Sequence, residues 1–175
     1  MMQRNRGITL LEMIFTITLI VFLVSSVLAI YIVCLQGWNN LGHQTDIHEK
    51  VHFGLERMIR DARESPSLVV ANHSLRFQNG ATGYIYYLYN SSDTWVPAYN
   101  QSSYELRKAT LTTAGSAGIA DDTFTYGSGD VVATGIMPPP QTSITASGNI
   151  ALITLKGQQG TDSLSVRGYV RPRNI

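Results

Sequence analysis

The residue that first raises a chemical question is Glu12, a carboxylate inside a long apolar stretch near the N-terminus. A carboxylate in a membrane segment is costly and usually pairs with a cation. No Lys or Arg stands three or four positions from Glu12 on either side, and Met13 to Leu35 carry no charge at all. If the chain were cut between Gly7 and Ile8, however, the new α-ammonium group of Ile8 would lie one helical turn from Glu12. The spacing therefore predicts a carboxylate that finds its cation only after cleavage.

The stretch Arg6-Gly7-Ile8-Thr9-Leu10-Leu11-Glu12-Met13 resembles the class III signal of type IV prepilins and type II secretion pseudopilins. The resemblance implies that a prepilin peptidase cuts after Gly7, that Ile8 is then N-methylated, and that Glu12 is the assembly residue. It also implies that Glu12 attracts the α-ammonium group of the preceding subunit and so sets the axial register of a filament. Desolvation offsets much of the attraction in such a pair, so we interpret it as a register device rather than a source of stability.

By the same resemblance, the expected partners are prepilin peptidase, other pilin or pseudopilin subunits and an inner-membrane assembly platform. Looser similarities in Glu56–Arg63, Tyr84–Leu88, Glu105–Arg107 and Arg171–Asn174 favour a minor subunit of the J or W type. Many major pilins carry a proline in the outer half of the helix, and none occurs here between Ile8 and Arg63. A major subunit and a non-polymerising, membrane-anchored binding module stay open as alternatives.

The apolar stretch is long enough to cross a membrane. As an α-helix, Met13 to Leu35 would measure about 34 Å, against a hydrocarbon core of about 30 Å. Arg4 and Arg6 precede it, and the next Lys or Arg is Lys50, so we expect a cytoplasmic N-terminus and a head outside the inner membrane. Filament assembly would then place the head in the periplasm or at the cell surface. A signal peptide cleaved near Ala29 is the alternative, but the apolar run continues past that point.

Two other groups of side chains could bind metal ions. His48 and His52 stand four residues apart, a spacing compatible with a helical metal site, but a third zinc ligand is missing and solvated histidines are favoured. Asp121, Asp122 and Asp130 are calcium candidates beside a Gly-Ser-Gly loop. Their spacing fits no EF-hand loop, so ordinary turns are favoured there and no cofactor is expected.

The aromatic tract Tyr84–Tyr89, with Trp95 and Tyr99, could stack on sugar or DNA, but a strand buried on both faces is favoured. The chain has 13 Lys and Arg against 12 Asp and Glu, so its charge gives no reason to expect nucleic acid as a partner. It shows no phosphate-binding glycine loop and no nucleophile with a matching base, so we expect no enzyme.

Two elements must position these residues. Apolar residues recur at helical spacing, which predicts an amphipathic helix that ends before Pro66; they are Ile47, Val51, Leu55, Met58 or Ile59, and Ala62. It would continue the membrane helix, with Gly37 and Gly42 as places where the helix could bend. After it come short runs rich in β-branched and aromatic residues. We expect strands at 67–71, 75–77, 84–89, 104–106, 123–126, 150–155 and 164–170, a tight turn at Asn79-Gly80, and loops at 114–118, 135–145 and 156–162.

The expected fold class is therefore α+β, with a long N-terminal helix whose second half packs on an antiparallel β-sheet head, a pilin-like layout. The expected organisation is a leader at 1–7, a transmembrane and polymerisation helix at 8–35, its amphipathic continuation at 36–64 and a globular head at 65–175.

Overall fold

The computed structural model describes residues 9–94, 99–112 and 123–173, apart from the side chains of residues 39–41, 43 and 44. The chain forms two compact units, Met1–Gly42 and His43–Ile175. One helix, α1 (Leu10–Arg63), contributes to both units. The helix continues without interruption through Gly37 and Gly42, the two positions at which the sequence predicts possible bends.

The first unit is the apolar half of α1. Within it, residues Leu10–Trp38 form a segment long and apolar enough to cross a membrane, and none of the segment is buried by other parts of the chain. A signal sequence near the N-terminus can also meet these criteria of length and composition. The segment therefore needs a surrounding other than the rest of this chain, because a row of exposed Leu, Ile, Val and Phe side chains is unfavourable in water.

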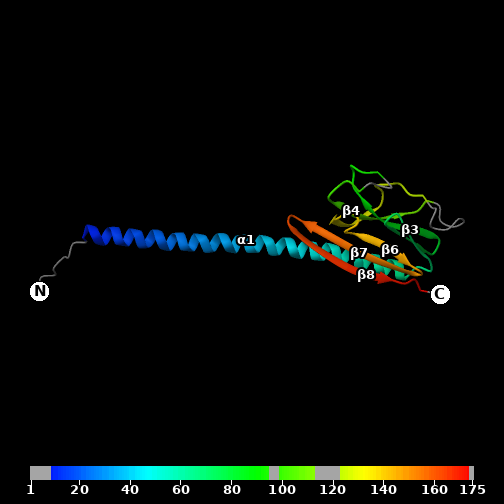
Figure 1. Cartoon of the computed structure of the whole chain (residues 1–175), viewed down its shortest axis with the longest axis horizontal. Helices are drawn as coiled ribbons and strands as arrows, with labels where there is room; N and C mark the ends of the chain where they lie inside the picture. Colours follow the sequence, from blue (N-terminus) through cyan, green and yellow to red (C-terminus); the bar gives the residue numbers. More distant parts are fainter. Residues whose placement is uncertain (1–8, 95–98, 113–122, 174–175) are drawn as a thin grey trace. The chain divides into compact units, whose positions relative to one another are not determined.

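The second unit combines the rest of α1 with an antiparallel sheet, which makes the chain an α+β protein (Figure 1). The sheet has the order β1-β2-β3-β4-β5-β7-β6, and β8 pairs with β7 outside this path. Most neighbours in the sheet are also neighbours in sequence, as short antiparallel connections require. The strands are β1 (Leu68–Ala71), β2 (Ser74–Asn79), β3 (Thr82–Tyr89), β4 (Tyr104–Thr110), β5 (Asp130–Ile136), β6 (Ser143–Ser147), β7 (Ile150–Gln159) and β8 (Asp162–Val170).

The core of the head lies between one face of the sheet and one stripe of α1 (Figure 1). Of the helix residues predicted for this stripe, Ile59 is only partly buried and the others are buried: Ile47, Val51, Leu55, Met58 and Ala62. The same core contains buried apolar side chains from the seven strands β2 to β8, among them Phe77, Tyr86, Leu106, Ile136, Ile144, Leu155 and Val170.

The β8 strand can approach α1 closely because one of its residues lacks a side chain. A Cβ atom at Gly168 would lie 2.5 Å from Ile59 Cδ1 and 3.3 Å from Leu55 Cδ2. Such distances are below normal van der Waals contact, so the packing of the helix on the final hairpin depends on this glycine.

The helix ends where the sequence predicts. Ser65, buried and just ahead of Pro66, lies beyond the last helical residue, Arg63. Its Oγ atom lies 2.6 Å from the Ser67 carbonyl oxygen and accepts hydrogen bonds from the backbone N–H groups of Ser67 and Gln78. This side chain therefore joins the end of α1 to β2.

Several strand predictions are confirmed and others are wrong. The predicted turn at Asn79-Gly80 joins β2 to β3, with Gly80 at φ +62°. The expected loop at 156–162 is mostly strand, because β7 extends to Gln159 and β8 begins at Asp162. The expected loop at 135–145 holds the end of β5 and the start of β6, although three prolines interrupt it.

The strand predicted at 123–126 is also wrong. Within it, Phe124 and Tyr126 pack on the side of β3 that faces away from α1, together with Tyr87 and Tyr89. The Thr123 carbonyl oxygen accepts a hydrogen bond from the Thr112 backbone N–H, but residues 123–126 are not in a β-strand. The aromatic residues that predict a strand here instead cover the outer face of the sheet.

Candidate functional site

Glu12 lies in the first turn of α1, which begins at Leu10. Thr9 precedes the helix, and its Oγ1 atom accepts a hydrogen bond from the Glu12 backbone N–H at 3.3 Å. Thr9 and Glu12 thus stand at the two key positions of a capping box, in which a Ser or Thr cap is followed three residues later by Glu or Gln. A carboxylate in the first turn also interacts favourably with the helix dipole. Glu12 therefore has a local role at the start of the helix.

The polar interruptions of the apolar segment are satisfied within the helix. The hydroxyl groups of Thr16, Thr18, Ser25 and Ser26 each donate to the carbonyl four residues earlier, at 2.7–2.8 Å. Such bonds remove the need for a partner in an apolar surrounding. Among the described residues of this segment, Glu12 carries the formal charge, which an apolar environment disfavours.

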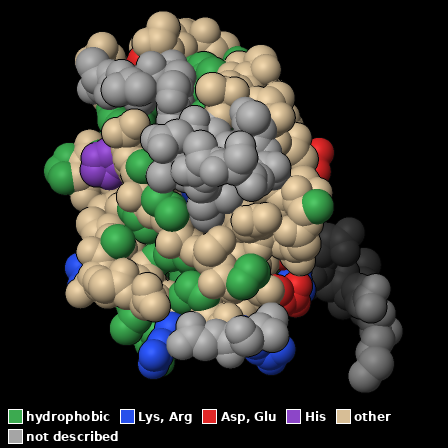
Figure 2. Space-filling model, turned by 90° about the vertical axis from the view of Figure 1, so that its right-hand side faces the viewer, with side chains coloured by type: hydrophobic (Ala, Val, Ile, Leu, Met, Phe, Trp, Pro, Cys, Tyr) green, Lys and Arg blue, Asp and Glu red, His purple; other side chains and the backbone are tan. Residues whose placement is uncertain are grey.

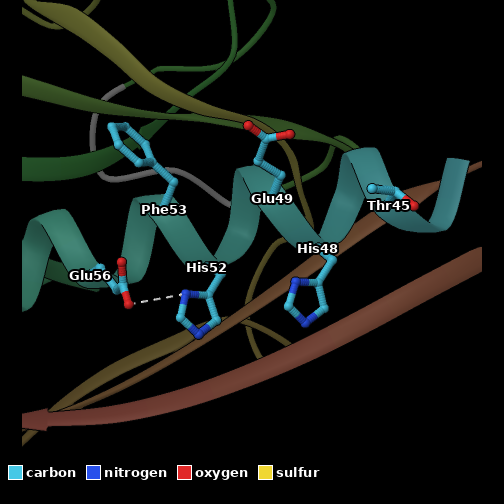
Figure 3. A pocket seen from close by; sticks show the side chains of 6 residues that line it. All are labelled: Thr45, His48, Glu49, His52, Phe53 and Glu56. Carbon is cyan, nitrogen blue, oxygen red and sulfur yellow. Dashed lines mark ion pairs between the residues drawn. The ribbon is translucent and has the colours of Figure 1, made fainter. Parts of the chain in front are cut away.

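The second half of α1 presents an open face opposite the buried stripe. Thr45, His48, Glu49, His52, Phe53 and Glu56 recur at helical spacing and line a shallow depression of about 650 Å³ (Figure 3). In Figure 3, His48 and His52 extend to one side of the helix, and Glu49 and Phe53 to the other. Phe53 is 53% exposed, and some other apolar side chains of the head are exposed too, among them Tyr169 and Leu152. This open face mixes apolar and charged groups, as surfaces that meet other proteins commonly do.

A buried polar network fastens the closed face of α1 to the sheet. The Asp61 Oδ2 atom accepts hydrogen bonds from Lys108 Nζ and from the Tyr86 hydroxyl, both at 2.7 Å. Burial acts to raise the pKa of Asp61, but the bonds from Lys108 and Tyr86 and the charge of Lys108 outweigh burial and hold that pKa below its usual value. Burial, and then the bond to the carboxylate, raise the pKa of Tyr86. The network therefore holds α1 against β3 and β4.

A second depression lies where α1 finishes. Arg60, Arg63 and Arg173 line it together with Glu56, Ile59 and Glu64, and its volume is about 400 Å³. The end-on view of the head shows a largely uncharged surface with basic side chains gathered along its lower edge (Figure 2). Both signs of charge line the depression, so it is a mixed polar surface.

The aromatic tract predicted to be a doubly buried strand is confirmed as one. Tyr86 and Tyr87, on opposite faces of β3, are both fully buried. The Tyr87 hydroxyl donates to the Ser128 carbonyl at 2.6 Å, and Arg107 stacks over the Tyr89 ring at 4.2 Å from its centroid. These rings are used inside the head, which argues against the sugar- or DNA-stacking alternative for this tract. Trp95 lies outside the described residues.

The structure describes only some of the predicted site residues. Gly7 and Ile8, the expected processing position, lie outside the described residues, as do Asp121 and Asp122. Asp130 is exposed at the first position of β5. Across residues 9–94, 99–112 and 123–173, no group of three or more His, Cys, Asp or Glu side chains converges on one point.

Two features of the site were not anticipated from the sequence. The cap at Thr9 could have been found from its Thr-x-x-Glu spacing, which is a sequence-level signal for a helix start. The bond between Asp61 and Lys108 joins residues 47 positions apart and has no local signal. Comparison with known protein families, with curated proteins and with solved structures found no match.

Proposed function

We propose that this chain is a structural subunit of a type IV pilus-like or type II secretion filament, and that it is a minor pilin or minor pseudopilin. The observation that carries the proposal is the division of α1. One half is apolar, exposed and headed by Glu12, while the other half is fastened to an antiparallel sheet. An exposed apolar helix that begins with a carboxylate is suited first to a bilayer and then to a bundle of identical helices.

In this proposal the apolar half of α1 holds the subunit in the inner membrane before assembly. The N-terminus is cytoplasmic, where prepilin peptidase cuts after Gly7, and the head lies outside. The cut frees the α-ammonium group of Ile8 and removes Arg4 and Arg6, the basic residues of the leader. Glu12 of an incoming subunit then pairs with the α-ammonium group of its neighbour as the helix leaves the bilayer.

The open face of the second half of α1 supports the same role. A helix that served only to anchor a head would gain nothing from an exposed Phe53, because an apolar side chain in water is unfavourable. Contact with neighbouring subunits would cover Phe53 and the shallow depression beside it. The remainder of the head, with its internally used aromatic residues and polar outer surface, supports a structural rather than a catalytic role.

The test of processing is mass spectrometry of the mature N-terminus in cells that contain a prepilin peptidase. The proposal expects a chain that begins at N-methylated Ile8. An intact Met1, or a cut near Ala29, would overturn it. A major subunit would show the same processing but would be the most abundant protein of the filament, and a membrane-anchored binding module would be absent from purified filaments.

A further inference from the structure

We propose that His48 and His52 form a binding site for a divalent first-row transition-metal ion such as Zn²⁺. The sequence alone favours solvated histidines, and both side chains are indeed exposed. The structure adds that the two rings lie face to face, with centroids 5.6 Å apart and planes inclined by only 10° (Figure 3). Imidazole nitrogen is a preferred ligand for Zn²⁺, Ni²⁺ and Cu²⁺.

The position of the rings suits joint coordination. Residues four apart on an α-helix lie on one face, one turn above the other. Both side chains are exposed, so modest rotations about their own bonds can bring one nitrogen of each ring to about 2.0–2.1 Å from a shared zinc ion. Backbone movement is not required, because α1 already holds the two Cβ atoms at the correct spacing.

Glu56 supplies the second observation. Its Oε1 atom lies 3.3 Å from His52 Nδ1, a contact between successive turns of α1 (Figure 3). Histidines that bind metals commonly donate their other ring N–H to a carboxylate, which fixes the tautomer and makes the ligating nitrogen a better donor. The neutral tautomer that carries its proton on Nδ1 places this proton next to Glu56 and keeps the Nε2 lone pair for a metal ion. The pair of histidines is thus accompanied by the orienting group that a metal site uses.

Water is expected to complete the coordination shell. Within the described part of the chain, no third His, Cys, Asp or Glu converges with the two histidines. Asp162 and His48 line a neighbouring depression of about 280 Å³, so a carboxylate lies nearby without being a direct ligand. The resulting site is open, and its affinity should be below that of a closed structural zinc site. An ion bound there would link two turns of α1 on the face that the head leaves open.

The test is isothermal titration of the full, untagged chain in detergent with zinc chloride. We expect saturable binding of one ion per chain, weakened at least tenfold by His48→Ala and by His52→Ala. Glu56→Gln should weaken binding by about tenfold, the lower range for loss of an orienting partner. The matched control is His73→Ala, which removes an exposed histidine at the turn between β1 and β2.

Helix content measured by circular dichroism separates loss of the site from loss of the fold. Alanine favours the helix, so His48→Ala should stay folded, and His48→Gln provides a second variant. Absence of saturable zinc binding would overturn the proposal, as would binding that survives the double replacement of His48 and His52. The outcome does not depend on whether the chain forms filaments, because the assay uses isolated subunits.

Discussion

The Nζ atom of Lys108 lies 2.7 Å from the Oδ2 atom of Asp61, and this ion pair joins the middle of the sheet to the helix. Both side chains are mostly buried, with 20% and 18% of their surfaces exposed. The ammonium group also lies 4.6 Å from the centroid of the Tyr84 ring. Such a pair fixes the position of α1 on the sheet, because moving the helix would break the ion pair and leave two mostly buried charges without partners.

Replacing Asp61 by Ala should therefore destabilise the head. The change removes two hydrogen bonds to a charged group and leaves Lys108 partly buried without a counter-ion, so we expect a loss of about 2–3 kcal/mol in the free energy of unfolding. Urea denaturation of the full chain in detergent, followed by the near-ultraviolet circular dichroism of the head, measures it. Asp46→Ala is the matched control. It removes an exposed pair with Lys50 and should cost less than about 0.5 kcal/mol.

Acid should weaken the head through the same carboxylate. The pKa of Asp61 is lower in the folded chain than its usual value. The ionised Asp61 therefore contributes fully to the free energy of unfolding above a pH of about 4, and this contribution is lost as the pH falls through the pKa that Asp61 has in the folded chain. Urea denaturation at a series of pH values should show this loss, and Asp61→Asn should reduce it. An unchanged acid dependence in Asp61→Asn would contradict this role.

Alkali should act through Tyr86. Its pKa is raised in the folded chain, so the folded state holds the phenolic proton more tightly than the unfolded state does. The contribution is complete below a pH of about 10 and declines as the pH rises above that value. Tyr86→Phe should lower stability at neutral pH by about 1–2 kcal/mol and make the protein less sensitive to alkali. Thermal unfolding between neutral pH and pH 11 checks both effects.

The glycine in β8 should accept a methyl group only if the neighbouring side chains shift. Gly168→Ala would press a methyl group against the ends of the Ile59 and Leu55 side chains, which can rotate, so we expect a cost near the lower end of overpacking, about 1 kcal/mol. Ser165→Ala, at an exposed position of the same strand, should be close to neutral. Equal effects of the two variants on the urea midpoint would show that the helix can move away from β8 at little cost.

The charge and the capping role of Glu12 can be separated by two substitutions. Glu12→Gln keeps a residue suited to the capping box but removes the charge, whereas Glu12→Ala removes both. If the charge sets register in a filament, both variants should fail to enter filaments, and Glu12→Asp should retain part of the activity. Incorporation measured by immunoblotting of sheared filaments, with membrane levels as the reference, gives the result. Normal incorporation of Glu12→Gln would show that pairing with the α-ammonium group is dispensable.

The sequence by itself determined the features that depend on near neighbours. Helical spacing identified the apolar stripe that α1 buries, Ser65-Pro66 marked the end of the helix, and Asn79-Gly80 marked a turn. The carboxylate at Glu12 and the apolar run after it were equally visible, since each is a property of a short segment. Six of the seven predicted strands exist, whereas β5 and β6 were not predicted.

Only the tertiary structure decided what such segments contact. The aromatic run at 123–126 lies over β3 instead of forming a strand, because Tyr87 and Tyr89 offer it an apolar surface. β5 reaches β7 through a single pairing, Ile136 with Gly157, which no local pattern specifies. The bond from Lys108 to Asp61 likewise depends on positions in space, because the two residues are 47 positions apart in the sequence. Local chemistry thus determined the elements, while long-range packing and pairing of buried charges determined how the elements meet within the head.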